Sequence, residues 1–207
     1  MTTPKAAAKP RDREATAAAI LDAARAILSE EGFAGFGVNA IARRAGCDKQ
    51  LIYRYYDGLE GLADAVGAAI AADFADALTP LATPTPKTYA DMVERLILGL
   101  ADLMRRDRGL QQIAAWEAAA PSPLVTCMAQ ARSARLGAWI QALRGGLEPP
   151  AGVDAAAINA ALIAAAQTLA THAGALGEFA GLKLETDANW RRARTALALL
   201  VRAAYAK

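Results

Sequence analysis

The chain has one histidine, His172, and two cysteines, Cys47 and Cys127, among its 207 residues. A single histidine excludes a two-histidine zinc site, and neither an HExxH sequence nor a cysteine-rich zinc pattern is present. The cysteines lie far apart without CxxC spacing, which favours a reducing compartment over a disulfide framework. No serine has the sequence context of a hydrolase nucleophile, and no predicted strand precedes a glycine-rich loop. We therefore expect a cytoplasmic protein that is not an enzyme and has no cofactor, metal or catalytic residue.

The charges are almost balanced, with 23 Lys and Arg against 21 Asp and Glu, so net charge indicates neither a nucleic-acid nor a membrane partner. One uncharged stretch, residues 155–177, is long enough to span a bilayer. Asn159 and Gln167 interrupt it, and most of the rest is alanine. Each Leu or Ile favours insertion by only about 0.3–0.6 kcal/mol. We predict a buried helix of a soluble protein and no membrane partner.

Strand-like alternation of apolar and polar residues is also missing, whereas apolar residues recur at three- and four-residue spacing along most of the chain. Alanine and leucine, which favour helices, dominate the composition. The chain is predicted to be all-α. We expect helices over residues 13–31, 38–45, 48–56, 59–78, 89–106, 109–119, 122–143, 155–173 and 187–207. Gly32 is placed to end the first of them, and Asp48, Asp154 and Asp187 are predicted to cap later ones.

Two segments have the composition of connectors. Residues 1–12, with Lys5 and Lys9, are predicted to be a basic flexible tail. Residues 79–88, "TPLATPTPKT", are rich in proline and threonine and are, by composition, the most plausible domain boundary.

The segment "DKQLIYRYY", residues 48–56, has too many rings and charges in succession for a wholly buried helix. On a helical wheel Ile52 and Tyr56 share one face, while Gln50 and Arg54 share the opposite face. Arginine matches the acceptors of guanine in the major groove, and glutamine matches adenine. A short predicted helix precedes this one across Gly46, which is the order of a helix-turn-helix. Helix–glycine–helix segments with polar flanks are also common in proteins that do not bind DNA.

The longer stretch from residue 14 to residue 62 resembles the DNA-binding domain of the TetR family of bacterial transcriptional regulators. The resemblance depends on "ILDAARAILSEEGF", "VNAIARRAGCDKQLIYRYY" and "LEGL". It implies an N-terminal three-helix helix-turn-helix domain, residues 13–58, and a larger C-terminal helical ligand-binding and dimerisation domain, residues 59–207. The second domain matches only in length and helicity.

The resemblance also implies residue roles. It places Lys49, Gln50 and Arg54 in the groove and Tyr53 and Tyr55 at phosphates. The chain departs from the family at two other implied contacts: Gly37 replaces a capping Ser or Thr, and Leu51 replaces a small polar residue. The full set of predicted DNA-binding residues is Gly37, Arg44, Lys49, Gln50, Leu51, Tyr53, Arg54 and Tyr55.

For the C-terminal domain the resemblance implies an effector pocket and a homodimer. Large rings and flexible methionines are suited to an apolar cavity, and the candidates are Met104, Trp116, Met128, Trp139, His172, Leu176 and Phe179. Small and apolar residues of the last two helices are suited to a four-helix interface, with Leu162, Ala166, Trp190, Leu197 and Val201 as candidates. All of these residues are also compatible with the ordinary core of one chain.

The function that follows is a ligand-responsive regulator. We expect its partners to be a palindromic double-stranded DNA operator, a second copy of the chain and a small hydrophobic or aromatic effector that releases the DNA. An activator, or a regulator that needs its ligand to bind, is compatible with the same residues. The alternatives from other classes are a helical protein-interaction module and an enzyme.

Overall fold

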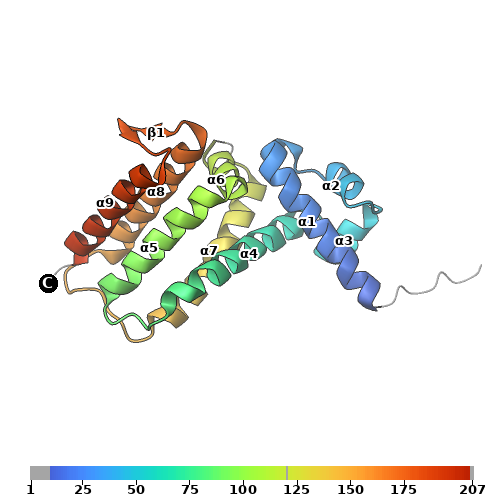
Figure 1. Cartoon of the computed structure of the whole chain (residues 1–207). Helices are drawn as coiled ribbons and strands as arrows, with labels where there is room; N and C mark the ends of the chain where they lie inside the picture. The colour runs from blue at the N-terminus through green and yellow to red at the C-terminus, as the bar shows by residue number, and fades with distance from the viewer. Residues whose placement is uncertain (1–9, 120, 206–207) are drawn as a thin grey trace, which may run out of the picture.

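The computed structural model describes residues 10–119 and 121–205, which are almost entirely helical. A small N-terminal group of helices lies at one end of an elongated molecule, and a larger group lies at the other (Figure 1). In chain order the helices are α1 Pro10–Gly35, α2 Val38–Arg44, α3 Gln50–Tyr56, α4 Leu59–Leu78, the short 3-10 helix η1 Thr79–Ala82, α5 Tyr89–Arg106, α6 Arg108–Ala119, α7 Pro123–Arg144, α8 Ala155–Ala175 and α9 Asp187–Tyr205. The all-α prediction is confirmed. It missed one feature, an antiparallel hairpin of β1 Glu178–Phe179 and β2 Leu182–Lys183 between α8 and α9.

Helix α1 is longer at both ends than the sequence predicted. It begins at Pro10, because proline is tolerated in a first helical turn, where its missing N–H has no intrahelical partner. The rest of the predicted tail, with Lys5 and Lys9, lies outside the described residues. Gly32 adopts the predicted positive φ (67°), but it kinks the helix and does not end it. One further turn follows, up to Gly35.

The N-terminal domain has a small core to which each of its helices contributes. Ile20 and Ile27 of α1, Ile41 of α2 and Ile52 of α3 are fully buried together with Leu62 of α4. Because β-branched and leucine side chains fill this centre, the short helices α2 and α3 are stabilised by packing and not by their own length.

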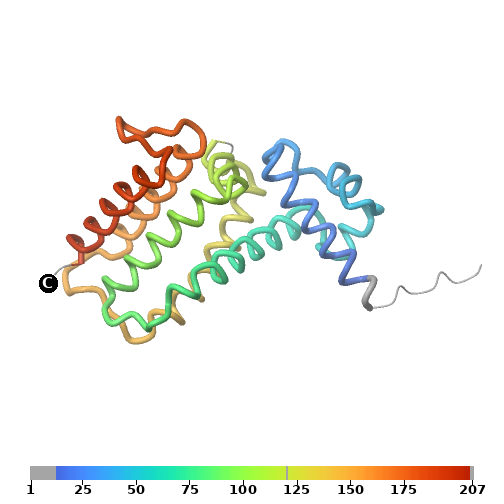
Figure 2. The backbone as a smooth tube through the Cα atoms, in the orientation of Figure 1, coloured from blue at the N-terminus to red at the C-terminus, as the bar shows by residue number. Residues whose placement is uncertain are grey.

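Helix α4 joins the two parts of the molecule (Figure 2). Its first turns belong to the N-terminal core, and an Arg25–Asp73 ion pair ties it to α1. In its middle, at Gly67, α4 packs against α7 so closely that a Cβ at Gly67 would lie 2.2 Å from the Met128 carbonyl oxygen. Of the described helices, only the stretch Leu59–Ala82 is long and apolar enough to span a membrane. Its inner face is buried against α1, α3 and α7, as expected for a core helix.

The C-terminal domain places α5, α8 and α9 side by side, with α7 packed along α4 (Figure 1). Asp154 caps α8 as predicted, its carboxylate accepting the Ala157 N–H at 3.0 Å. The cap of α9 is Thr186, because Asp187 is the first helical residue and pairs instead with Arg105.

Two predictions about this domain need correction. The segment 79–88 contains η1 and connects α4 to α5, two helices that pack in the same domain. The uncharged stretch 155–177 was predicted to be a buried helix, but α8 is buried only on the side that carries Leu162, Ala166 and Ala170. Its alanine-rich opposite side is exposed, because α5 and α9 cover one side only.

Candidate nucleic-acid interface and internal cavity

The turn between α2 and α3 is built from the residues that the sequence singled out. Gly46 has a φ of 65°, a conformation that a residue with a Cβ rarely adopts. The Asp48 carboxylate accepts the Gln50 N–H at 2.8 Å, so Asp48 caps the start of α3. At the other end Asp57 is left-handed and closes the helix with a hydrogen bond from its N–H to the Tyr53 carbonyl (3.0 Å).

Helix α3 is attached to the protein by one face and exposed on the other. Ile52 is fully buried, and the Tyr56 hydroxyl donates to the Ala17 carbonyl of α1 at 2.7 Å. Burial raises the pKa of Tyr56, so this hydroxyl stays protonated. On the opposite face Gln50 and Arg54 are exposed, and 58% of Tyr53 is accessible. The inward and outward faces are therefore those that the helical wheel predicted.

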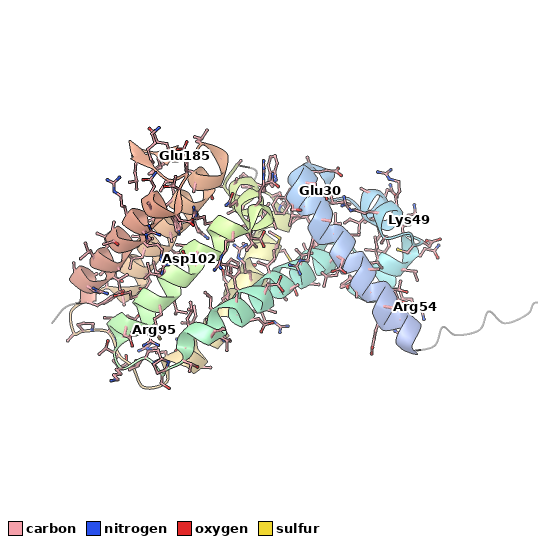
Figure 3. The ribbon with its side chains drawn as sticks, viewed as in Figure 1. Glu30, Lys49, Arg54, Arg95, Asp102 and Glu185 are labelled. Carbon is pink, nitrogen blue, oxygen red and sulfur yellow. The ribbon has the colours of Figure 1, made fainter. Side chains whose placement is uncertain are left out.

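The remaining predicted DNA contacts have mixed surroundings. Lys49 is exposed beside the exposed face of α3, and Lys49 and Arg54 lie at the end of the molecule away from Asp102 and Glu185 (Figure 3). Gly37 precedes α2 in an extended conformation with open space where a Cβ would be. Leu51 and Tyr55 are half-buried and pack against the N-terminal core, and the Arg13 guanidinium lies 5.9 Å from the centre of the Tyr55 ring.

Arg44 is already engaged within the protein. Its guanidinium donates two hydrogen bonds of 2.6 Å to the carboxylate of Glu30 on α1. This pair lowers the pKa of Glu30 and raises that of Arg44. A phosphate would have to share or displace Glu30, so Arg44 is less available for DNA than Lys49 or Arg54. Cys47 beside this turn is a free, half-buried thiol whose pKa is raised by burial, which disfavours a reactive thiolate.

A cavity of about 500 Å³ lies in the C-terminal domain between α4, α5, α7 and α8. Its wall is mostly apolar, with Phe74 from α4, Leu96 from α5 and Leu136 from α7. At the Tyr89 end three polar groups are linked, since the Tyr205 hydroxyl donates to Asn159 Oδ1 (2.7 Å) and Asn159 Nδ2 donates to the Tyr89 hydroxyl (2.9 Å). Burial, and secondarily Tyr89, raises the pKa of Tyr205 to about 12. Two arginines, Arg132 and Arg144, also line the cavity.

The seven residues predicted to form an effector pocket are not brought together. Only Trp139 lines the cavity. The others are distributed between the closed core and the surface: Met104 and Met128 are fully buried, Trp116 packs on Gly32, Leu176 is 73% exposed, and His172 stacks edge-on with Phe179 at 4.6 Å beside the hairpin. Ring size and flexibility identify candidates for packing, but they do not show which side of a helix faces a cavity.

None of the α5 residues that line the cavity was among the predicted pocket residues. Val93, Leu96, Ile97 and Leu100 form an apolar stripe of this helix, and with Tyr89 and Met92 the stripe is broader than one packed face requires. The width of that arc is the signal that could have indicated a lining role. Nothing in the spacing of Arg132 and Asn159 indicates that they face a cavity.

The predicted dimer-interface residues are all buried within one chain. Leu162 and Ala166 of α8, with Trp190, Leu197 and Val201 of α9, are at most 6% exposed. They belong to the buried core cluster of the chain, in which α5, α8 and α9 contact one another. The surface of these two helices is formed instead by other residues, which are uncharged over much of its area: Ala156, Ala157, Ala160, Ala161, Ile163 and Ala164 of α8, and Thr195, Ala196, Leu199, Leu200 and Ala203 of α9.

This combination of a three-helix DNA-binding unit and a larger helical domain is that of a known class of regulators. Residues 20–66 match the family described as bacterial regulatory proteins, tetR family. An uncharacterized HTH-type transcriptional regulator of Mycobacterium tuberculosis is 32% identical over 114 residues, covering 51% of this chain and 50% of that protein. The chain thus spans about half the length of the curated relatives it matches.

Solved structures share the whole fold. A TetR family transcription regulator from Marinobacter aquaeolei VT8 is 18% identical, with a TM-score of 0.64 over 93% of this chain and 98% of that one. A structure described as a SmeT–triclosan complex is 22% identical, with a TM-score of 0.59 over 93% and 92%. Residues 20–66 therefore form a helix-turn-helix DNA-binding domain of the tetR family, and the chain as a whole has the fold of the TetR family structures. The members of this family are transcriptional regulators and not enzymes.

Proposed function

We propose that the protein is a repressor that binds a palindromic operator as a homodimer and releases it when a small apolar effector enters the C-terminal cavity. The observation that carries the proposal is the construction of α3. Ile52 and Tyr56 fix one face of this helix in the core, while Gln50, Tyr53 and Arg54 extend from the other.

The exposed face of α3 has the chemistry that a major groove requires. Arg54 is suited to guanine O6 and N7, and Gln50 to adenine N6 and N7. Tyr53 and Lys49 are suited to phosphate oxygens, which position the helix without reading sequence. Each of these four side chains is exposed and none is held by an ion pair within the described residues. They can therefore contact DNA without first breaking a bond inside the protein.

The proposed dimer uses the exposed faces of α8 and α9 in place of the predicted buried residues. Leu199 and Leu200 are 59% and 56% exposed and lie near small side chains such as Ala196 and Ala203. Small residues allow helices to approach closely, and two helices from each copy would form a four-helix interface. A two-fold dimer would present two α3 helices roughly 34–36 Å apart, one turn of DNA.

The effector proposal depends on the cavity and its mostly apolar wall. A cavity of this volume is in the range used for small ligands, and the triclosan complex of a structural relative has an apolar aromatic ligand. Because α4 lines the cavity with Phe74 and Leu78 and also contacts α1 and α3, a tilt of α4 would change the separation of the α3 helices. By linkage, effector and operator would then weaken each other.

The test is selection of bound sequences from a random duplex pool by the purified protein at fixed salt. The expected result is a palindrome whose half-sites lie about one helical turn apart. Enrichment of single half-sites would remove the dimer from the proposal. A lack of enrichment, with no retention on DNA at low salt, would refute DNA reading by α3. If the protein were retained on DNA in a salt-dependent way but enriched no sequence, it would bind DNA through phosphate contacts without reading bases.

A further inference from the structure

One ion pair connects the cavity to helix α6. Arg132 lines the cavity, and its guanidinium donates hydrogen bonds of 2.5 and 2.9 Å to the two carboxylate oxygens of Glu117. Both side chains are mostly buried, with 20% and 16% of their surfaces exposed. Glu117 lies in the last turn of α6. A bidentate arginine–carboxylate pair has a fixed geometry, so it holds the end of α6 against the cavity wall.

The residue before Glu117 contacts the DNA-binding domain. The Trp116 indole lies on Gly32 of α1, where a Cβ would come within 2.7 Å of two ring carbons. Gly32 is the buried kink of α1, so the contact is with the backbone of the helix that supports α2 and α3. Adjacent residues of α6 therefore contact the cavity arginine and the DNA-binding domain.

The start of α6 is held independently of its end. The buried Gln111 amide donates to the carbonyls of Met104 and Arg105 at 2.8 and 3.1 Å, which ties α6 to the end of α5. If the Glu117–Arg132 pair opened, the start would stay in place and the last turn would be free to move. Trp116 would move with it, because it belongs to that turn.

We propose that the Glu117–Arg132 pair is a latch, and that the effector is an apolar carboxylic acid whose carboxylate replaces that of Glu117 on Arg132. This inference rests on the proposed function, whose effector it specifies. The apolar part of the ligand occupies the wall of Leu96, Leu136 and their neighbours. The displaced Glu117 side chain then rotates into solvent, and the last turn of α6 moves away from Gly32.

The energetics select a carboxylate over a neutral ligand. Opening the latch without a replacement anion would leave the Arg132 guanidinium mostly buried and unpaired, which is strongly unfavourable. Exchange of one carboxylate for another keeps the guanidinium paired, and Glu117 gains hydration near the exposed end of α6. A neutral apolar molecule can fill the cavity but leaves the latch closed. Only an acid couples binding to movement of α6.

A second ion pair in the cavity wall provides a control for the Glu117–Arg132 pair. Arg144, the second arginine of the wall, pairs with Glu148 and donates to the Leu147 carbonyl at 2.7 Å. Glu148 lies just beyond α7, four residues from its partner, and not on α6. Glu148→Gln and Arg144→Gln therefore alter a cavity ion pair without touching the contact between α6 and α1.

The first part of the test measures binding of decanoate and 1-decanol to the full chain by calorimetry. Wild-type protein should prefer the acid. Arg132→Gln should lower that preference at least about tenfold, the loss expected for a charged hydrogen bond, and Arg132→Lys should lower it less. Glu117→Gln removes the competing carboxylate and should raise decanoate affinity about tenfold. Arg144→Gln and Glu148→Gln should leave the preference unchanged, and thermal melting confirms that each variant is folded.

The second part follows amide hydrogen exchange in residues 26–35 of α1 and 110–119 of α6. Decanoate should accelerate exchange in both segments of the wild-type protein, whereas 1-decanol should not. Glu117→Gln should accelerate both without any ligand, and Glu148→Gln should not. Residues 190–204 of α9 provide an internal reference that should remain unchanged.

Several results would overturn the proposal. These are equal affinity for acid and alcohol, no binding of either probe, a preference that depends on Arg144, and exchange in α1 that is the same with and without decanoate. If selection from the duplex pool still yields a palindrome, such a result refutes the latch and leaves the regulator intact. Conversely, decanoate binding that depends on Arg132 and accelerates exchange in α1, with no DNA sequence enriched, would support the latch and refute the operator.

Discussion

The exposed face of α3 and the exposed face of α8 and α9 are both unpaired within one chain, but their chemistry differs. The α3 face offers hydrogen-bond donors and charge from Lys49, Gln50, Tyr53 and Arg54. The α8 and α9 face is dominated by alanine with exposed leucines such as Leu199. An exposed polar side chain keeps its hydration until a polar partner replaces it, whereas exposed apolar area is stabilised by any close-fitting cover. Exposure alone therefore does not distinguish a DNA surface from a protein surface, and the side-chain chemistry does.

The largest expected effect is on the apolar face. Leu199→Glu would place an unpaired carboxylate from each copy in the proposed interface, where burial of a charge is very costly. We expect the dimer dissociation constant, measured by sedimentation, to rise at least about a hundredfold. Leu176→Glu is the matched control, because Leu176 is 73% exposed and lies beyond the end of α8. If Leu199→Glu remained as dimeric as the control, the copies would associate through another surface.

The next effect is on base recognition by the polar face. Arg54→Ala should cost about 1–3 kcal/mol of operator binding and relax specificity at one base position in each half-site. The measurement is the affinity for the selected operator and for its single-base variants at one salt concentration. Arg135→Ala, an exposed arginine of α7, should change neither quantity. Unchanged operator affinity in Arg54→Ala would show that the groove-facing surface has been assigned incorrectly.

A smaller and uniform effect is expected at Tyr53. Tyr53→Phe removes a hydroxyl from a side chain that is 58% exposed, and a neutral hydrogen bond contributes about 0.5–1.5 kcal/mol. Because phosphates carry no sequence information, affinity should fall equally for the operator and for random duplexes. A loss confined to the operator would instead give Tyr53 a role in reading bases.

The smallest effect concerns the ion pair between α1 and α2. Arg44 lowers the pKa of Glu30, so the pair stabilises the fold above the ordinary glutamate pKa and this contribution is lost as pH falls through the lowered value. Glu30→Gln should lower the melting temperature slightly at neutral pH, and the difference from wild type should vanish in acid. The same variant frees Arg44 and should strengthen DNA retention at low salt. A difference that grows on acidification would contradict this assignment.

Local pattern was sufficient to predict the N-terminal domain. Ile20, Ala23, Ala24 and Ile27 recur at three- and four-residue spacing, which places them on one face of the first helix, and the structure buries that face. Glycine at 46 and Asp48 likewise act within a few residues of their own position, so their roles follow from the sequence. The start of α1 was predicted too late, because proline is compatible with either a tail or a first turn.

The C-terminal site could not be predicted in the same way. Its helices are apolar on more than one side, and composition does not show which side meets a neighbour, a cavity or solvent. Leu197 was expected at an interface but is buried in the core of one chain, whereas Leu199, two positions away, is exposed. Trp116 was expected in the pocket but contacts the backbone at Gly32.

By itself the sequence determined the helical class, the position of the helix-turn-helix and the residues on its outer face, because these depend on periodicity and on short-range turns. The tertiary structure alone decided that Arg132 pairs with Glu117, that Tyr89 and Asn159 meet at one end of the cavity, and that α6 contacts α1. Such contacts join residues far apart in the chain, and they depend on how whole helices are rotated and offset against one another. Periodicity within a single helix does not specify that arrangement.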